Sequence, residues 1–183
     1  GLGNQFLANI RETDAIIHVL RCFDDGNIIH VDGSVNPIRD KEVIDIELQL
    51  KDLETIEKRI ASLARILKSG DKEVVKENEI AQRIKIELEK GISVRALEFD
   101  EKEWEFVHKF QLITSKPVLY LCNVDESSVK NGNNYVDMVR ENVKNEGAEV
   151  LVIGAKIEAD ITELETYEER QMFLEELGLE EPG

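Results

Sequence analysis

Apolar residues along the chain follow two different spacings, which predict two kinds of secondary structure. Near-continuous apolar runs at residues 15–22, 117–122 and 149–153 predict short strands, the first of them buried on both faces. Between the first two runs, from Asp40, apolar residues recur every three or four positions, which indicates helices. This order of strands and helices favours an α/β fold with a parallel sheet and an inserted helical segment.

The inserted segment predicts an antiparallel helical hairpin followed by a third helix. Its first helix carries an apolar seam spaced as in a coiled coil and is interrupted at Gly70. A second helix is expected at 72–90 and a third at 99–110. The seam consists of Ile46, Leu50, Leu53, Ile56, Ile60, Leu63 and Leu67. Outside the insertion, helices are expected at residues 4–12, 135–145 and 161–177.

The amino-acid composition limits the kinds of partner that the chain is expected to bind. The chain has 183 residues and a net charge of −16, and ten acidic side chains against one basic lie in residues 157–183. Such acidity disfavours non-specific binding to polyanions, although most basic residues lie in the helical segment. Without an 18-residue apolar window, no membrane span is expected. Cys22 and Cys122 are predicted to be reduced, buried thiols, and no spacing of Cys and His indicates a metal site.

The most informative residues follow the second strand. The apolar run at 117–122 leads into Asn123-Val124-Asp125-Glu126, at the sheet edge where ligands bind in open α/β folds. Guanine-binding GTPases have Asn-Lys-x-Asp there, so Val124 replaces the lysine and Glu126 replaces the aspartate. The amide of Asn123 suits either the edge of a purine or a tie between two loops. A structural turn that caps the next helix is the alternative.

Four stretches of the sequence carry a resemblance to a known family. Residues 1–25, 27–60, 112–123 and 159–183, with GLGN, NIIHV and N-x-x-E among them, resemble the YchF/Obg-like ATPases. These are P-loop NTPases of the translation-factor class. The resemblance runs in collinear order over nearly the whole chain and is weaker at about residues 62–105.

The resemblance implies three segments and two missing parts. Residues 1–39 and 113–183 would be two parts of a nucleotide-binding domain, the latter with an acidic C-terminal helix, and 40–112 an inserted coiled-coil domain. The phosphate-binding G-x-x-x-x-G-K-[ST] and the Mg²⁺-associated D-x-x-G do not occur here and are expected upstream of Gly1. A TGS module is expected after Gly183. Ligands for Mg²⁺ and phosphates would then lie outside this chain, which alone would be inactive.

The resemblance also implies a base site. Asn123 and the backbone at Val124 would lie beside the base, with Val124 in place of the lysine whose stem covers the ring. Glu126 is one methylene longer than aspartate, so its carboxylate would overshoot the position that meets the guanine N–H groups, and the resemblance implies a preference for ATP. The exit loop at Gly154 and Ala155 would supply the last base contacts, with Gly154 replacing a hydroxyl residue. The alternative is an ordinary turn at the end of the strand.

Two more residues have roles that the resemblance suggests. His30 matches a family residue implicated in hydrolysis, where an imidazole would orient or deprotonate the attacking water. The alternative is a packed or solvated histidine. Phe23 would stack near the adenine or, alternatively, cap the core.

The resemblance implies a cytoplasmic, monomeric protein that uses ATP or GTP with Mg²⁺ as a translation-linked switch. It would bind the ribosome or ribosomal RNA through the helical domain and the TGS module, and no membrane. The basic residues expected near the hairpin tip are either an RNA contact or solvated: Lys58, Arg59, Arg65, Lys68, Lys72 and Lys76. Two alternatives remain open, a GTP-preferring regulatory GTPase of the same fold and a non-enzymatic coiled-coil interaction segment.

Overall fold

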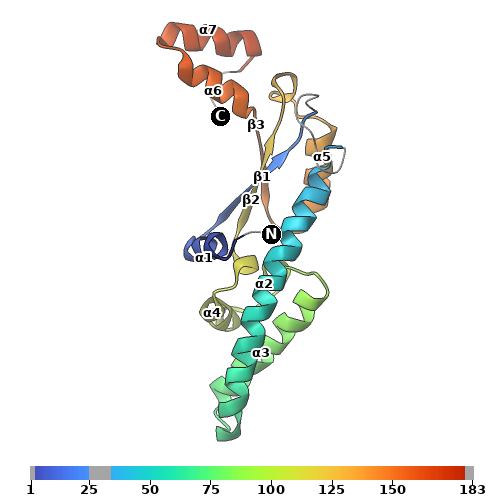
Figure 1. Cartoon of the computed structure of the whole chain (residues 1–183), viewed down its shortest axis with the longest axis vertical. Helices are drawn as coiled ribbons and strands as arrows, with labels where there is room; N and C mark the ends of the chain where they lie inside the picture. Colours follow the sequence, from blue (N-terminus) through green and yellow to red (C-terminus); the bar gives the residue numbers. More distant parts are fainter. Residues whose placement is uncertain (1–2, 25–33, 180–183) are drawn as a thin grey trace. The chain divides into compact units, whose positions relative to one another are not determined.

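The computed structural model describes residues 3–24 and 34–179 (Figure 1). Strands and helices alternate in the predicted order. No helix within the described residues is both long and apolar enough to cross a bilayer. The elements are α1 (Asn4–Glu12), β1 (Ile16–Arg21), α2 (Pro37–Ile66), η1 (Leu67–Ser69), α3 (Lys72–Glu89), η2 (Val94–Ala96), α4 (Glu101–Phe110), η3 (Ile113–Ser115), β2 (Val118–Asn123), η4 (Glu126–Ser128), α5 (Asn134–Val143), β3 (Glu149–Ile153), α6 (Ala155–Glu163) and α7 (Tyr167–Leu177), where η marks a 3₁₀ helix.

The three strands form a parallel sheet with β2 in the middle. β2 and β3 are parallel, and Asn123 lies opposite Ile153 at their carboxyl ends. β1 runs in the same direction, because Ile16 N–H donates to Pro117 C=O at one end (2.9 Å) and Cys22 N–H donates to Asn123 C=O at the other (2.8 Å). The predicted α/β fold is confirmed.

One face of β1 contradicts the prediction that this strand is buried on both faces. Leu20 is 2% exposed, whereas Ile17 and Val19 are 62% and 59% exposed. Successive side chains of a strand point to opposite faces, so these two lie on the face opposite Leu20. A continuous apolar run therefore identified the strand correctly but overestimated how much of it is covered within this chain.

The helical insertion is an antiparallel hairpin, as predicted. Two ion pairs show that the helices are antiparallel, because the later residue of α3 pairs with the earlier residue of α2. Glu77 pairs with Arg59 at 2.5 Å, and Lys85 pairs with Glu57 at 2.8 Å. Gly70, with φ of 72°, makes the turn between the helices, where its left-handed backbone favours glycine. The buried core of the hairpin contains Ile56 and Leu63 from α2 and Ile80, Ala81, Ile84 and Leu88 from α3.

The predicted seam on α2 is wrong in its first half. Ile46 and Leu50 are 55% and 57% exposed, while Leu48 and Asp52 are buried. The helix also begins at Pro37, three residues before the expected start, since proline is well suited to the first position of a helix. The buried stripe therefore includes a charged residue, which a search for apolar spacing does not find.

Asp52 is buried because it holds the turn that precedes β2. Its two carboxylate oxygens accept the backbone N–H groups of Ile113 and Thr114 at 2.8 and 2.7 Å. Burial raises the pKa of Asp52, and these two hydrogen bonds oppose that rise. The hydroxyl of Thr114 in turn accepts the N–H of Val94 at 3.2 Å. The 3₁₀ turn η3 is thus tied to α2 and to η2.

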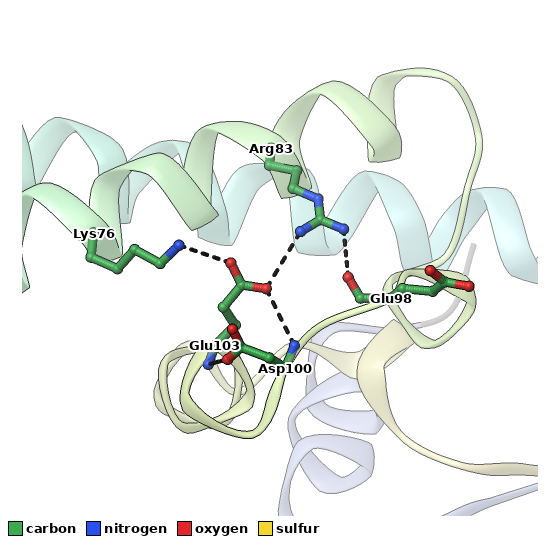
Figure 2. A network of polar contacts seen from close by, with 5 residues as sticks. All are labelled: Lys76, Arg83, Glu98, Asp100 and Glu103. Atoms are coloured by element: carbon green, nitrogen blue, oxygen red, sulfur yellow. Dashed lines mark hydrogen bonds and ion pairs between the residues drawn. The ribbon is translucent and has the colours of Figure 1, made fainter.

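A network of charges fixes α4 against α3 (Figure 2). The Glu103 carboxylate lies 2.9 Å from Lys76 Nζ and 3.6 Å from Arg83 Nη1. Asp100 and Glu103 also form a capping box at the start of α4. The hydrogen bond from Lys76 lowers the pKa of Glu103. A single carboxylate therefore both begins α4 and joins it to the hairpin.

The expected helix at 161–177 is two helices. α6 ends at Glu163 and α7 begins after Thr166, whose hydroxyl accepts the N–H of Glu169 (3.2 Å) while the Glu169 carboxylate accepts the N–H of Thr166 (3.1 Å). This capping box starts a new helix without glycine or proline. Leu174 folds back onto Ile157 and Ile161 of α6.

The chain packs into two compact units. One contains the described parts of Gly1–Ile16 and Glu42–Pro117, and the other those of Ile17–Lys41 and Val118–Gly183. The first includes the hairpin and the second includes most of the sheet. These units differ from the three predicted segments in placing α1 with the helices. The assignment of the segments as functional domains stays a prediction.

Candidate functional site

A hollow of about 1010 Å³ lies where the strands of the sheet unit end. It is lined by residues that follow each of the three strands and by the end of α7. The carboxyl edge of a parallel sheet is the usual place for a ligand. Five of the seven predicted site residues line it: Phe23, Asn123, Val124, Glu126 and Gly154.

Asn123 ties two of the strand exits together. It is the last residue of β2, and its Oδ1 accepts the backbone N–H of Ala155, the first residue of α6, at 2.9 Å. Ala155 therefore takes part in the site through its backbone. Because Oδ1 is engaged, the NH₂ group of Asn123 is the part that can meet a ligand as a donor.

Val124 does not cover the hollow as a lysine stem would. Its side chain is only 4% exposed, and its N–H donates to the carbonyl of Ile153 at 2.8 Å. The expectation that Val124 takes the place of a ring-covering side chain finds no support in this burial. With the N–H already paired, the backbone at this position has its carbonyl, an acceptor, to offer a ligand.

The two carboxylates after Val124 have different surroundings. Asp125 Oδ2 accepts the hydroxyl of Ser127 at 2.5 Å, and hydrogen bonds from Ser127 and Ser128 lower the pKa of Asp125. Glu126 begins η4 and is exposed. The carboxylate nearer in sequence to Asn123 is thus held by the loop, and the farther one lies at the rim.

Gly154 is required by packing. A Cβ at this position would lie 2.7 Å from Cγ2 of Val129 and 3.0 Å from Cδ1 of Ile157. Both distances are shorter than normal carbon contacts. The hydroxyl residue that the resemblance leads one to expect at this loop therefore has no room here.

The side chain of Phe23 is partly exposed and contacts Arg21. The Arg21 guanidinium lies 4.8 Å from the centre of its ring, and Arg21 Nε donates to the Phe23 carbonyl at 3.1 Å. The partly exposed ring lines the hollow. Such a cation–π contact fixes the ring at the rim, where an aromatic face is available to a planar ligand.

The sequence did not point to several residues that shape this edge. Asn133 Nδ2 donates to the Cys22 carbonyl at 2.7 Å, while its Oδ1 caps α5. Tyr135 Oη donates to the Asp24 carboxylate at 2.9 Å, and this raises the pKa of Tyr135. Lys130 lies against Gly178 at the carboxyl end of α7, where a cation is favourable. Only the cap at Asn133 has a recognisable sequence signal, an asparagine before a helix.

Cys22 and Cys122, close to this edge, are buried thiols, as predicted. Both are 0% exposed and free. The neighbouring Cys122 thiol and burial raise the pKa of the Cys22 thiol, so Cys22 stays protonated and unreactive at neutral pH.

His30 lies outside the described residues, so its predicted role has no structural counterpart here. Within residues 3–24 and 34–179, no group of three or more His, Cys, Asp or Glu side chains is arranged to hold a metal ion.

Comparison with known proteins shows which proteins this chain is similar to. It is 50% identical over its whole length to the ribosome-binding ATPase YchF of Bacillus subtilis and 48% identical to that of Escherichia coli O157:H7. A solved structure of the Schizosaccharomyces pombe YchF GTPase matches 98% of the chain with a TM-score of 0.84 and 32% identity. The resemblance to the YchF/Obg-like ATPase family is confirmed.

The chain spans about half the length of the YchF relatives it matches. It is also 40% identical, over 83% of its residues and 39% of the relative, to the Obg-like ATPase 1 of Oryza sativa subsp. indica. No family model matches the chain. The names given to the YchF relatives include both an ATPase and a GTPase, so they leave the choice of purine open.

Proposed function

We propose that this chain supplies the base-binding part of a ribosome-associated nucleoside triphosphatase that prefers ATP to GTP. The names of its relatives, ribosome-binding ATPase and YchF GTPase, support a nucleotide-binding protein of this kind. The hollow at the sheet edge supplies the place for the base. The observation that carries the proposal is the hydrogen bond from the Ala155 N–H to Asn123 Oδ1. Because this bond occupies the amide oxygen, it leaves the NH₂ group of Asn123 as a donor for the base.

The proposed contacts match adenine group by group. The NH₂ of Asn123 is a donor suited to the ring nitrogen N7, which both purines have. The carbonyl of Val124 is an acceptor suited to the exocyclic amine of adenine. Guanine has a carbonyl oxygen at that place, and two acceptors facing each other would cost affinity. Phe23 would lie near the ring.

We propose that guanine is recognised poorly because neither Asp125 nor Glu126 is suited to accept its N–H groups. Guanine needs an acceptor for the two N–H groups on its far edge. Asp125 already accepts from Ser127, and Glu126 stands where the aspartate of Asn-Lys-x-Asp would be. The longer side chain of Glu126 would place its carboxylate beyond those N–H groups. This argument disfavours guanine. A preference for GTP is kept as the second candidate because the Schizosaccharomyces pombe relative is named a GTPase.

The base site can be tested on the 183-residue chain by NMR. Titration with ATP is expected to shift the signals of the Asn123 side-chain amide and the Ala155 backbone amide. Affinity should be weak, with a dissociation constant above about 100 μM, because most affinity of P-loop proteins comes from phosphate contacts that are not encoded here. GTP should give smaller shifts at the same positions.

Asn123→Ala provides the decisive variant in that titration, with Asn131→Ala as its control. Asn131 lines the same hollow but does not tie the two loops. Only Asn123→Ala is expected to remove the response to ATP. Shifts that survive in Asn123→Ala, or that centre on residues far from the sheet edge, would contradict the base site.

The choice of purine is expected to depend on Glu126. In a longer polypeptide that also carries the phosphate-binding loop, Glu126→Asp should lower the ATP-to-GTP affinity ratio on the order of tenfold, because the shorter carboxylate meets the guanine N–H groups. Val124→Lys is unsuitable as a partner change, since it would bury an ammonium group. Competition between the two nucleotides measures the ratio, and an unchanged ratio would count against the proposal.

We also propose that the helical hairpin contacts ribosomal RNA. Arg59 and Lys76 are engaged in ion pairs, whereas Lys68 and Lys72 near the turn are exposed. Reversing these two charges, in Lys68→Glu/Lys72→Glu, is expected to weaken co-sedimentation with ribosomes and to lower its salt slope by about 2. Lys102→Glu/Lys109→Glu on α4 is the control. Equal loss in both variants would indicate general charge attraction instead.

A further inference from the structure

A second hollow is lined by the link between α6 and α7 and by residues of α7. It has a volume of about 570 Å³ and an apolar floor formed by Leu164, Met172 and Phe173. Met172 is 69% exposed, and Tyr167 at the start of the same helix is 71% exposed. Tyr167 does not line the hollow, whereas the exposed Met172 lines it together with Leu164 and Phe173, and this apolar patch on an acidic helix marks the hollow as an interaction surface.

Carboxylates surround the apolar floor. Glu168 and Glu169 lie one turn before Met172, and Glu175 and Glu176 lie one turn after it. Positions three and four apart are neighbours on a helix, so all four carboxylates flank the same methionine. All four are exposed. The surface thus combines a central apolar contact with a negative rim.

The one basic residue of this region does not neutralise the rim. Arg170 is the only basic side chain in residues 157–179. Its guanidinium donates to the carbonyl of Leu164 from Nε at 3.0 Å and from Nη2 at 2.8 Å. It therefore serves to hold the link between the two helices, and the rim keeps its negative potential.

The hollow is built on a fixed support. Leu174, 1% exposed, packs with Ile157 and Ile161 beneath it, and the capping box of Thr166 and Glu169 sets the start of α7. A preformed surface needs little ordering when it binds, which favours affinity.

We propose that the groove formed by Leu164, Met172 and Phe173 binds a basic protein segment that presents an apolar side chain between lysines or arginines. Charge complementarity selects this partner, because the rim attracts cations while the floor accepts an apolar group. Nucleic acids and anionic membranes carry the wrong charge for this rim. The proposal does not depend on the base site, because Leu164, Met172 and Phe173 do not line the hollow at the sheet edge, although Glu176 lines both hollows.

A short lysine-rich peptide with two leucines one helical turn apart is a suitable probe. Binding to the full 183-residue chain is followed by fluorescence anisotropy, and NMR shifts locate the site. We expect shifts at residues 164–176 and an affinity that falls as salt is raised. A matched peptide with alanines in place of the leucines should bind on the order of tenfold more weakly, since it lacks the apolar contact.

Variants separate the groove from general acidity. Glu168→Lys/Glu175→Lys reverses two rim charges outside the capping box and is expected to weaken peptide binding on the order of tenfold. Met172→Ser should weaken it by about fivefold through the floor. The control is Asp137→Lys/Glu141→Lys, two exposed acidic residues of α5 with the same change in net charge. This control should retain binding within about twofold.

Three results would overturn the proposal. The first is equal weakening by the α5 control and by Glu168→Lys/Glu175→Lys, which would mean attraction to net charge alone. The second is equal binding of the leucine and alanine peptides together with an unaffected Met172→Ser. The third is binding of a short RNA probe at residues 164–176. Circular dichroism melting of each variant shows that a loss of binding does not come from unfolding.

Discussion

Asp52→Ala is expected to lower the free energy of unfolding by about 3 kcal/mol. The substitution leaves the N–H groups of Ile113 and Thr114 buried without an acceptor, at about 1–3 kcal/mol each, and the removal of a buried charge offsets part of this. Urea unfolding of the whole chain measures the change. A loss below about 1 kcal/mol would show that water or a rearranged turn replaces the carboxylate.

Asp52→Asn serves as the matched variant, because it keeps one acceptor oxygen and removes the charge. Its stability should lie between those of the wild type and the alanine variant. Since burial raises the pKa of Asp52 above its ordinary value of 3.8, the folded protein holds this proton more tightly than the unfolded chain does. Asp52 therefore contributes a loss of stability as the pH rises from 3.8 through its raised pKa, and no further change beyond it. The asparagine variant should lack this particular dependence, and an identical pH profile would contradict the assignment.

His30→Ala is expected to slow ATP hydrolysis roughly 10²-fold in a polypeptide that also carries the phosphate-binding loop. The reason is the proposed role of its imidazole in orienting or deprotonating the attacking water. Nucleotide affinity should change little, because the phosphate contacts remain. Single-turnover hydrolysis, with binding measured separately, distinguishes the chemical step from affinity.

His18→Ala is the control for that experiment. The His18 ring packs 5.8 Å from the ring of Tyr120 in the sheet, so its loss should lower the melting temperature and spare turnover per folded molecule. If His30→Ala behaves as His18→Ala does, with normal turnover and a lowered melting temperature, His30 is a packing residue and the catalytic proposal fails.

The position of the candidate site could be predicted because it depends on local order along the chain. An apolar run that ends in polar residues marks where a strand leaves the core. Parallel strands then bring these exits to one edge. Phe23, Asn123 and Gly154 line one hollow for that reason, although they lie at the ends of three different strands.

Contacts between distant residues could not be predicted in this way. An acidic residue in a helix is normally expected at the surface, yet Asp52 is buried because its partners lie 61 and 62 residues further along the chain. Apolar spacing therefore assigned Ile46 and Leu50 to the wrong face of α2. The crowding around Gly154 likewise appears only when Val129 is placed beside it.

The break between α6 and α7 had a local signal that apolar spacing overlooks. Thr166 and Glu169 stand in the T-x-x-E order of a capping box, which is a sequence signature of a helix start. A helical period that continues on both sides of such a box does not mean one helix. Attention to caps would have divided residues 161–177 correctly.

The close packing of Gly154 makes its evolutionary history depend on that of Val129. A residue larger than glycine at 154 becomes acceptable only after Val129 has become smaller, because the two would otherwise overlap. Shrinking Val129 first opens a void beside the cluster of Ile157, Ile161 and Leu174. Each single step is therefore unfavourable, while both together are tolerable. Homologous chains are expected to change these positions as a pair, so a hydroxyl at the loop should accompany a smaller residue at 129.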